Sequence, residues 1–363
     1  MDSLLGSRLS DAPSDSAASG ASGAVGAVGA VGPLSGALSI AAPDAAGWHP
    51  DILPGFVQRP IGPATLVKSL AVPNSPRGVI LHIHGYNDYF FQSHFAQELT
   101  DAGYIFYAVD LRNAGRSLRP DGLPHFATDL HQPATDVAAA AEFVRDEHPE
   151  LPLVVHAHST GGLIAALWAH AYRNETGVKA PPEALVLDAP FFEVPGTFFK
   201  RAGAWAAAPA GRLRPTTALS ASPSAYSSAM HVDNGGRWSF DTSLKNPDGV
   251  PIRLGWLRAV RAAQGRVDRG LDIKGPVLLA ASAASSGHDP MLADSTDTVL
   301  DVSAITSRAD KLGSDVTVLQ IPGAVHDLTL SADEPRAKYF TELIDWLDKC
   351  ISISPPVADT PSL

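Results

Sequence analysis

The stretch LPLVVHAHSTGGLIAALWAHA, residues 151–171, changes character at Ser159. Apolar, β-branched residues precede the serine, as in a buried strand, and an alanine- and leucine-rich run follows it, as in a helix. Small residues, Ala157 and Gly161, stand two positions to either side. A sharp strand-to-helix turn strains the serine backbone and leaves no room for larger neighbours, so AHSTG (157–161) predicts a nucleophile elbow. A serine that merely caps the helix is the plainer alternative.

Strand-like and helix-like segments alternate on both sides of this turn. Apolar runs predict strands at 64–72, 78–85, 104–110, 151–158, 184–189, 275–282 and 315–322. Helices are predicted at 88–103, at 134–148, directly after the serine, and at 336–350. Nearly continuous apolar strands are typical of buried parallel sheets. The alternation therefore predicts an α/β fold, with a mostly parallel central sheet and helices on both faces.

Both ends of the chain and one internal segment depart from this pattern. Residues 1–46 are rich in Gly, Ala, Ser and Val, which predicts a disordered low-complexity tail, and 351–363 predict a short C-terminal tail. Residues 190–272 interrupt the alternation and contain many prolines and glycines. We expect them to form an inserted cap, or lid, between two parts of one core domain, 47–189 and 273–350.

Composition limits the classes of function. The net charge of −11 argues against a nucleic-acid partner. A single cysteine, Cys350, excludes an intrachain disulfide and a cysteine-based metal site. The first fifteen residues carry three acids and one arginine, and glycine, serine and proline dilute the apolar run that follows. This pattern is not typical of a secretory signal or a membrane helix, so we expect a cytoplasmic protein.

Three motifs resemble those of the α/β-hydrolase family, in particular monoacylglycerol lipases and related serine aminopeptidase-like hydrolases. The elbow is similar to the family's G-H-S-x-G, with Ala157 in place of the first glycine. HIHGYND (82–88) resembles a strand-end His-Gly, which implies that the Tyr86 amide is an oxyanion donor. DLRNAGRS (110–117) resembles a strand-end Asp with its glycine loop, from which Ala114 departs. The resemblance covers about residues 60 to 350 and implies the same fold and a serine nucleophile.

The first turn of the helix after Ser159 adds a second donor. The Thr160 amide and the helix dipole are placed to stabilise an oxyanion there. A nucleophilic serine also needs a base, and the base needs an orienting acid. The histidines that follow the serine are His170, His231, His288 and His326. His326 lies just beyond the last predicted strand, which is the position of the family's catalytic histidine.

The acid is sought in the loop after the strand at 275–282. Its candidates are Asp289, Asp294, Asp297 and Asp301. DTVLD (297–301) resembles the family's D-x-x-x-D pattern, whose first aspartate is catalytic. The resemblance thus implies Asp297 as the acid and Asp301 as a helix cap or supporting residue.

Together these residues predict a serine hydrolase that cleaves carboxylic esters through an acyl-enzyme and without a cofactor. It would be a carboxylesterase or monoacylglycerol lipase-like enzyme, and a peptidase, amidase or thioesterase on the same triad stays open. The expected partner is a small ester with an apolar acyl or alcohol part, and the oligomeric state stays open. Substrate contacts are expected from His84, His158, Phe198, Trp205 and Trp256.

The insertion and the histidines allow other interpretations. Lys200 and Arg201 beside Phe198 and Trp205 would suit a weak lipid-surface contact, but the aromatic residues would equally suit packing on the core. Two H-x-H pairs, His82/His84 and His156/His158, suggest a metal-dependent hydrolase. No matched carboxylate pattern accompanies them, and we expect no metal. A non-catalytic binding protein on a hydrolase scaffold is the remaining alternative.

Overall fold

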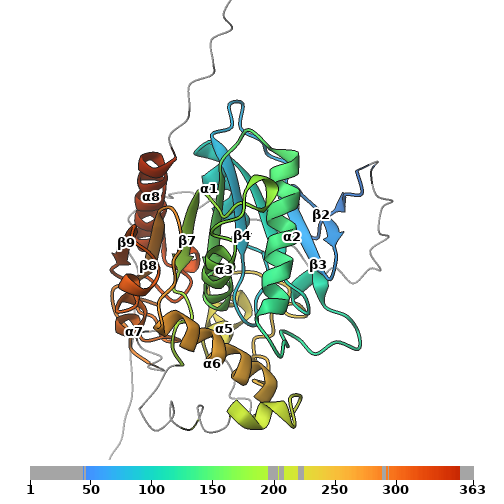
Figure 1. Ribbon diagram of the computed structural model, residues 1–363, viewed down its shortest axis with the longest axis vertical. Helices are drawn as coiled ribbons and strands as arrows, with labels where there is room; N and C mark the ends of the chain where they lie inside the picture. Colours follow the sequence, from blue (N-terminus) through green and yellow to red (C-terminus); the bar gives the residue numbers. More distant parts are fainter. Residues whose placement is uncertain are drawn as a thin grey trace, which may run out of the picture. The chain divides into compact units, whose positions relative to one another are not determined.

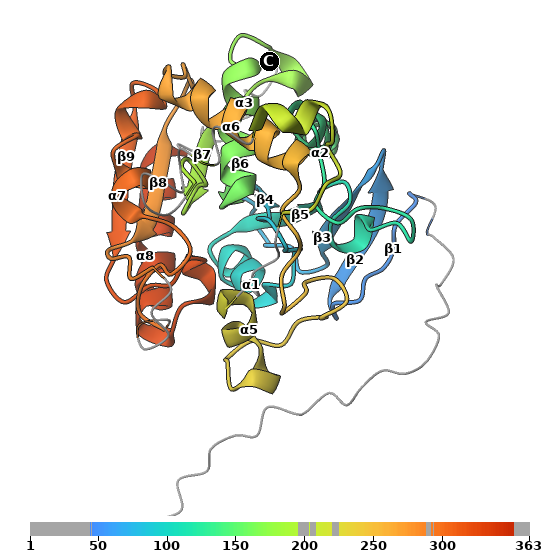
Figure 2. The ribbon, with the colours of Figure 1, turned by 90° about the horizontal axis from the view of Figure 1, so that it is seen from below.

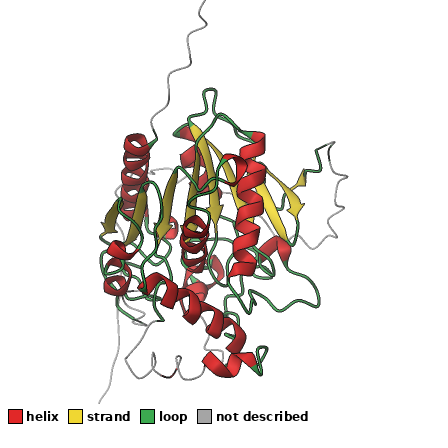
Figure 3. Cartoon of the chain, viewed as in Figure 1, coloured by secondary structure: helices red, strands yellow, loops and turns green. Residues whose placement is uncertain are grey.

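A nine-stranded sheet organises the part of the chain that the computed structural model describes, which is residues 44, 46–194, 203, 208–219, 225–287, 292 and 294–351. Its strands lie side by side in Figures 1 and 3, and their order is β1-β2-β3-β5-β4-β6-β7-β8-β9. The first three strands pair antiparallel with their neighbours; they are β1 His49–Pro50, β2 Phe56–Ile61 and β3 Ala64–Ser69.

The six later strands run parallel to one another. They are β4 Gly78–Ile83, β5 Tyr104–Asp110, β6 Leu153–His158, β7 Ala184–Asp188, β8 Val277–Ser282 and β9 Val316–Ile321. Every residue of β4 to β8 is buried, as expected for strands that are covered on both faces. The predicted mostly parallel sheet is thereby confirmed.

Helices cover both faces of the sheet. Helices α2 (His131–Glu147) and α3 (Thr160–Ala171) lie on one face, and α1 (Ser93–Asp101) and α8 (Asp333–Cys350) lie on the other (Figure 2). The remaining α-helices of the described residues are α5 (Ala225–Met230), α6 (Leu254–Asp268) and α7 (Val302–Thr306). None of the helices in this part of the chain has the length and apolarity needed to cross a membrane.

Several boundaries differ from the prediction. The helix expected at 88–103 begins at Ser93. Asp88 is ion-paired with Lys245, and the Phe90 amide donates to Asp110 Oδ1 at 2.9 Å instead of to a helical carbonyl. These contacts hold residues 88–92 in a loop. Strands β1 and β2 and helix α6 were not predicted; α6 lies in the segment 190–272, which was interpreted only as an inserted cap.

Loops that follow the parallel strands bring distant segments to one edge of the sheet. Ser159 follows β6, Tyr86 follows β4, and His326 follows β9. Asp297 lies in the loop after β8. The carboxyl ends of parallel strands are the usual place for ligand sites in open α/β sheets. The four residues chosen from the sequence therefore gather where a site is expected.

Candidate active site

Ser159 has the backbone strain expected of a nucleophile elbow. Its φ of 52° and ψ of −118° are rare for a residue with a side chain. A methyl group on Gly161 would stand 2.3 Å from the His84 carbonyl oxygen, and one on Gly162 would stand 2.9 Å from Pro190 Cβ. The glycines thus let α3 begin against the neighbouring loops, and the strained turn places Ser159 in the lining of a cavity at the sheet edge.

A chain of polar contacts joins Ser159, His326 and Asp297. Ser159 Oγ lies 3.0 Å from His326 Nε2, and His326 Nδ1 lies 2.9 Å from Asp297 Oδ2. Asp297 is fully buried, and its Oδ1 accepts the backbone amides of Val299 at 2.8 Å and Leu300 at 2.7 Å. These two amides fix the carboxylate so that Oδ2 faces the imidazole.

The other candidate acids and bases lie elsewhere. Asp301 caps the N-terminus of α7, where its Oδ1 accepts the Ser303 amide at 3.0 Å. Asp294 is exposed. His170 Nδ1 accepts the Asp272 amide at 2.8 Å, and His231 caps a short 3₁₀ helix. His288 and Asp289 lie outside the described residues.

Two backbone amides, those of Tyr86 and Thr160, lie beside the serine. A methyl group on Gly85 would stand 3.1 Å from Ser159 Cβ, so the loop that carries Tyr86 runs directly past the elbow. The Thr160 amide is at the first position of α3 and has no acceptor within the helix. Within the described residues the Tyr86 amide donates no backbone hydrogen bond either. Both amides are available to an anionic oxygen.

A cavity of about 350 Å³ opens beside Ser159 and His326. One wall is apolar and includes Phe191, Val250, Ile252 and Leu300. The polar part of the lining includes Asn87, Asp88, His158, Ser227 and Lys245. The volume is within the usual range for a small-molecule site.

Of the residues expected to contact substrate, two line the cavity and two lie outside the described residues. His158 and Trp256 line the cavity, and Trp256 also packs on Tyr86, with ring centroids 4.4 Å apart. Phe198 and Trp205 lie outside the described residues.

His84 supports the loop that carries Tyr86. Its Nδ1 donates to the Gly85 carbonyl at 2.7 Å and its Nε2 accepts the Leu111 amide at 3.0 Å. It is buried and is not among the described residues that line the cavity beside Ser159, but it lines a smaller one with Tyr86, Thr160 and Trp256. A contact between His84 and substrate stays a prediction.

The two H-x-H pairs do not form one site. His82 and His156 face each other with their Nδ1 atoms 2.9 Å apart, and His156 Nε2 lies 2.9 Å from the Tyr339 hydroxyl. Burial lowers the pKa of His156 to about 3 and also lowers that of His82. These two rings are neutral members of the core. His84 instead lies beside the loop after β4, and His158 lies directly before the elbow serine.

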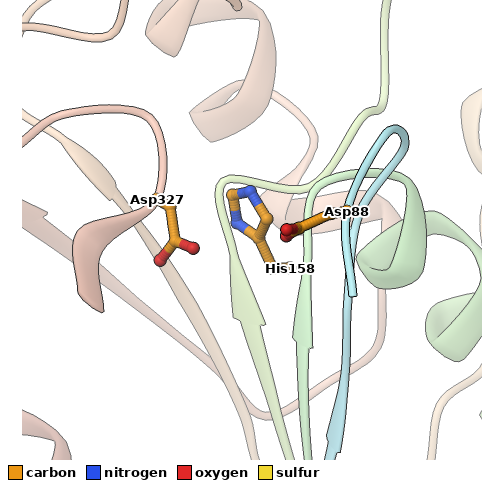
Figure 4. A group of neighbouring side chains, drawn as sticks. All are labelled: Asp88, His158 and Asp327. Atoms are coloured by element: carbon orange, nitrogen blue, oxygen red, sulfur yellow. The ribbon is translucent and has the colours of Figure 1, made fainter. Parts of the chain in front are cut away.

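A buried charged cluster lies beside the elbow. Asp88, His158 and Asp327 each bring one atom that could bind a metal within 4.8 Å of the others (Figure 4). However, Lys245 Nζ donates to Asp88 Oδ1 at 2.7 Å, and Gln92 Nε2 donates to Asp327 Oδ2 at 3.2 Å. A lysine ammonium already neutralises part of the charge that would attract a cation. The donor set fits an internal ion cluster better than a metal site.

The charges of this cluster shift the pKa values of its members. Burial acts to lower the pKa of His158, but the charges of Asp327 and Asp188 outweigh it and raise the pKa to about 9. Burial raises the pKa of Asp188 to about 6. Burial acts to raise the pKa of Asp327, but His158, the Thr329 hydroxyl and Lys245 lower it overall. The surrounding carboxylates therefore favour the protonated form of His158.

Several residues of this site were not found from the sequence. Asp88 ends the HIHGYND motif, Asp327 directly follows His326, and Asp188 lies at the end of a predicted strand; these positions are the signals that could have found them. Lys245 and Tyr226 line the cavity from the insertion, where no local pattern marks them. Their roles follow from contacts across more than a hundred residues of sequence, such as that of the Asp327 amide with the Tyr226 hydroxyl at 3.0 Å.

Comparison with known proteins agrees with the fold. The model of the family described as serine aminopeptidase, S33, matches residues 74–333. A monoacylglycerol lipase of Mycolicibacterium smegmatis is 32% identical over 117 residues, which are 32% of this chain and 41% of the lipase. The match thus spans about two fifths of the length of that relative.

Solved structures show the same architecture. A soluble variant of monoglyceride lipase from Saccharomyces cerevisiae, in complex with a substrate analog, is 19% identical with a TM-score of 0.59, covering 82% of this chain and 95% of that one. Monoacylglycerol lipase of Paleococcus ferrophilus is 18% identical with a TM-score of 0.58, covering 78% and 98%. These likenesses show the fold, and the family match extends over well over half of the chain. The chain is a member of the serine aminopeptidase S33 family of α/β-hydrolases.

Proposed function

We propose that this protein is a serine ester hydrolase in which Ser159 is the nucleophile, His326 the general base and Asp297 the orienting acid. The observation that carries the proposal is the pair of contacts at 3.0 Å and 2.9 Å that links the three side chains, of which Ser159 and His326 line the cavity. This is the arrangement in which a neutral imidazole can take the serine proton while the carboxylate holds its tautomer.

The reaction has two halves. Ser159 Oγ attacks the acyl carbon as its proton passes to His326 Nε2, and the amides of Tyr86 and Thr160 bind the oxyanion that forms. The leaving alcohol takes the proton from Nε2, and the acyl group stays on Ser159. Water then repeats the sequence and releases the acid. Removal of one oxyanion donor typically costs about 10²–10³ in turnover, so the two amides account for a large part of the rate.

The shape of the cavity supports an ester that has an apolar part. The wall of Phe191, Val250, Ile252 and Leu300 suits an acyl chain or an apolar alcohol. The polar part of the lining suits a hydroxylated portion. A carboxylesterase or monoacylglycerol lipase-like activity agrees with both, and two of the similar proteins are named as lipases of this kind.

One observation weighs against an aminopeptidase on the same triad. Such an enzyme would need a carboxylate to bind the substrate's ammonium group. Among the described residues that line the cavity, the carboxylate is Asp88, and Lys245 already pairs with it at 2.7 Å. This ion pair therefore favours ester hydrolysis over aminopeptidase activity.

A substrate panel tests the proposal. Wild-type protein and the Ser159→Ala variant are assayed on p-nitrophenyl esters from acetate to palmitate and on aminoacyl p-nitroanilides. We expect ester hydrolysis by the wild type, none above background by Ser159→Ala at an unchanged melting temperature, and slower or absent anilide cleavage. Anilides cleaved faster than every ester would favour a peptidase, and ester hydrolysis that survives the substitution but is lost on chelation would favour a metal mechanism.

A further inference from the structure

The loop that follows β4 is held by one short segment of the insertion. Tyr86, Asn87 and Asp88 come directly after Gly85, and all three contact residues 245–251, which we call the strap. The Tyr86 hydroxyl donates to the Pro251 carbonyl at 3.1 Å. Three consecutive residues next to the elbow thus depend on a segment about 160 positions away in the sequence.

Asn87 contributes a pair of hydrogen bonds to the strap. Its Nδ2 donates to the Asn246 carbonyl at 2.8 Å, and its Oδ1 accepts the Asn246 amide at 3.1 Å. Asn87 has a φ of 54°, in the left-handed region that costs free energy for a residue with a side chain. The two bonds to Asn246 stabilise this conformation, which sets the direction of the peptide that follows Tyr86.

Asp88 and Lys245 add a buried ion pair. Both residues are 3% exposed, and Lys245 Nζ donates to Asp88 Oδ1 at 2.7 Å. The ammonium also lies 4.9 Å from the centre of the Phe91 ring and 5.3 Å from that of Phe240. Removing one member of a buried pair leaves an uncompensated buried charge, so loss of either side chain destabilises the docked position of the strap.

The loop fixed in this way also carries the Tyr86 amide. Given the proposed function, on which this inference rests, we propose that the strap positions the oxyanion hole, with Lys245 and Asn87 as its positioning residues. Gly249 and Val250 of the strap line the cavity. A substrate that packs on the apolar side chains of the cavity therefore contacts the same segment that holds the loop. Contacts to the acyl chain would then raise kcat as well as lower KM.

The test uses the full chain and three substitutions. Lys245→Met removes the ammonium and keeps the length of the side chain, and Lys245→Arg keeps the charge. Lys274→Met is the matched control, because Lys274 makes a lysine–aspartate contact of 2.8 Å to Asp272 on the exposed surface. The readouts are kcat and KM on a p-nitrophenyl ester and the Ki of an alkyl trifluoromethyl ketone, whose serine adduct places an oxyanion in the hole.

A misplaced oxyanion donor should cost part of the kcat that deletion of the donor would cost. We expect Lys245→Met to lower kcat about 10- to 100-fold and to raise the Ki of the ketone by a similar factor. KM should stay within about twofold, Lys245→Arg should recover much of kcat, and Lys274→Met should match the wild type. An unchanged kcat and Ki in Lys245→Met would overturn the inference.

A double variant separates positioning from simple stability. Asp88→Asn in the Lys245→Met background removes the unpaired charge, so the melting temperature should recover. If the strap positions the hole, kcat and the ketone Ki should stay impaired in the double variant; recovery of both together with stability would overturn the inference. A wild type that hydrolyses no ester and is not labelled at Ser159 by a fluorophosphonate would overturn the proposed function itself. An active wild type together with an equally active Lys245→Met variant would overturn only the inference that the strap positions the oxyanion hole.

Discussion

Replacing Asp297 with asparagine is expected to stop turnover while leaving the protein folded. The direction of the amide follows from the structure. Oδ1 of Asp297 accepts two backbone amides, from Val299 and Leu300, so the amide oxygen of asparagine must take that position. Its NH₂ group then occupies the place of Oδ2 and faces His326 Nδ1, now as a donor. The imidazole must accept there, and its proton moves to Nε2.

This tautomer places an N–H against the serine hydroxyl, where the mechanism needs a lone pair. The same substitution in the chymotrypsin-type triad lowers kcat about 10⁴-fold. A loss of that size corresponds to about 5 kcal/mol of transition-state stabilisation. Because the two backbone hydrogen bonds to Oδ1 survive, we expect the free energy of unfolding of Asp297→Asn to stay within about 1 kcal/mol of the wild type.

The matched control makes the same chemical change four residues along the chain. Asp301→Asn alters a helix cap, and asparagine caps about as well as aspartate. Turnover on a p-nitrophenyl ester and urea unfolding are measured for both variants. We expect Asp301→Asn to retain nearly full kcat. A crippled Asp301→Asn beside an active Asp297→Asn would refute the assignment of the acid, as would a loss in Asp297→Asn that unfolding accounts for.

Three further outcomes are expected. The pKa of His158, about 9 and above its ordinary 6.5, means that protonated His158 stabilises the fold fully below pH 6.5 and loses this contribution as the pH rises toward 9. Raising the pH from 6.5 to 9 should lower the wild type's free energy of unfolding, measured with urea, by on the order of 3 kcal/mol more than that of His158→Gln. The same pH dependence in both proteins would contradict the ion cluster. Gly161→Ala should lower the melting temperature sharply, because the new methyl would stand 2.3 Å from the His84 carbonyl oxygen; a stable, active variant would show that the elbow has more room. Trp256→Ala should cost about 3–5 kcal/mol and shift the preferred ester to a longer chain, whereas Trp346→Ala, which removes a core tryptophan away from the cavity, should cost stability and leave the preference unchanged.

The sequence predicts those parts of the site that lie in short local motifs. The sequence predicts Ser159 because the small residues that its strained turn requires stand at fixed offsets, and it predicts His326 because that residue follows a recognisable strand. The buried strands were equally visible, since strands covered on both faces read as apolar runs. Here the local signal and the tertiary structure agree.

The rest depends on contacts that no short pattern records. Lys245 pairs with Asp88 across 157 positions, and although Asp88 ends the HIHGYND motif, no local pattern marks Lys245 as its partner. His84 is expected to contact substrate, and only the tertiary structure shows that both of its nitrogens bind backbone groups. Helix α6 keeps apolar residues at positions 256, 260, 263 and 267, but it lies in a proline- and glycine-rich segment that was interpreted only as a cap.

Labelling with a fluorophosphonate, with ester hydrolysis followed in the same sample, tests the central claim most directly. A neutral serine hydroxyl does not react with this probe unless a base and an oxyanion site activate it. We predict one label per chain, mapped by peptide mass spectrometry to Ser159, with hydrolysis lost in proportion to labelling. A label on another residue, or full hydrolysis after stoichiometric labelling of Ser159, would contradict the account.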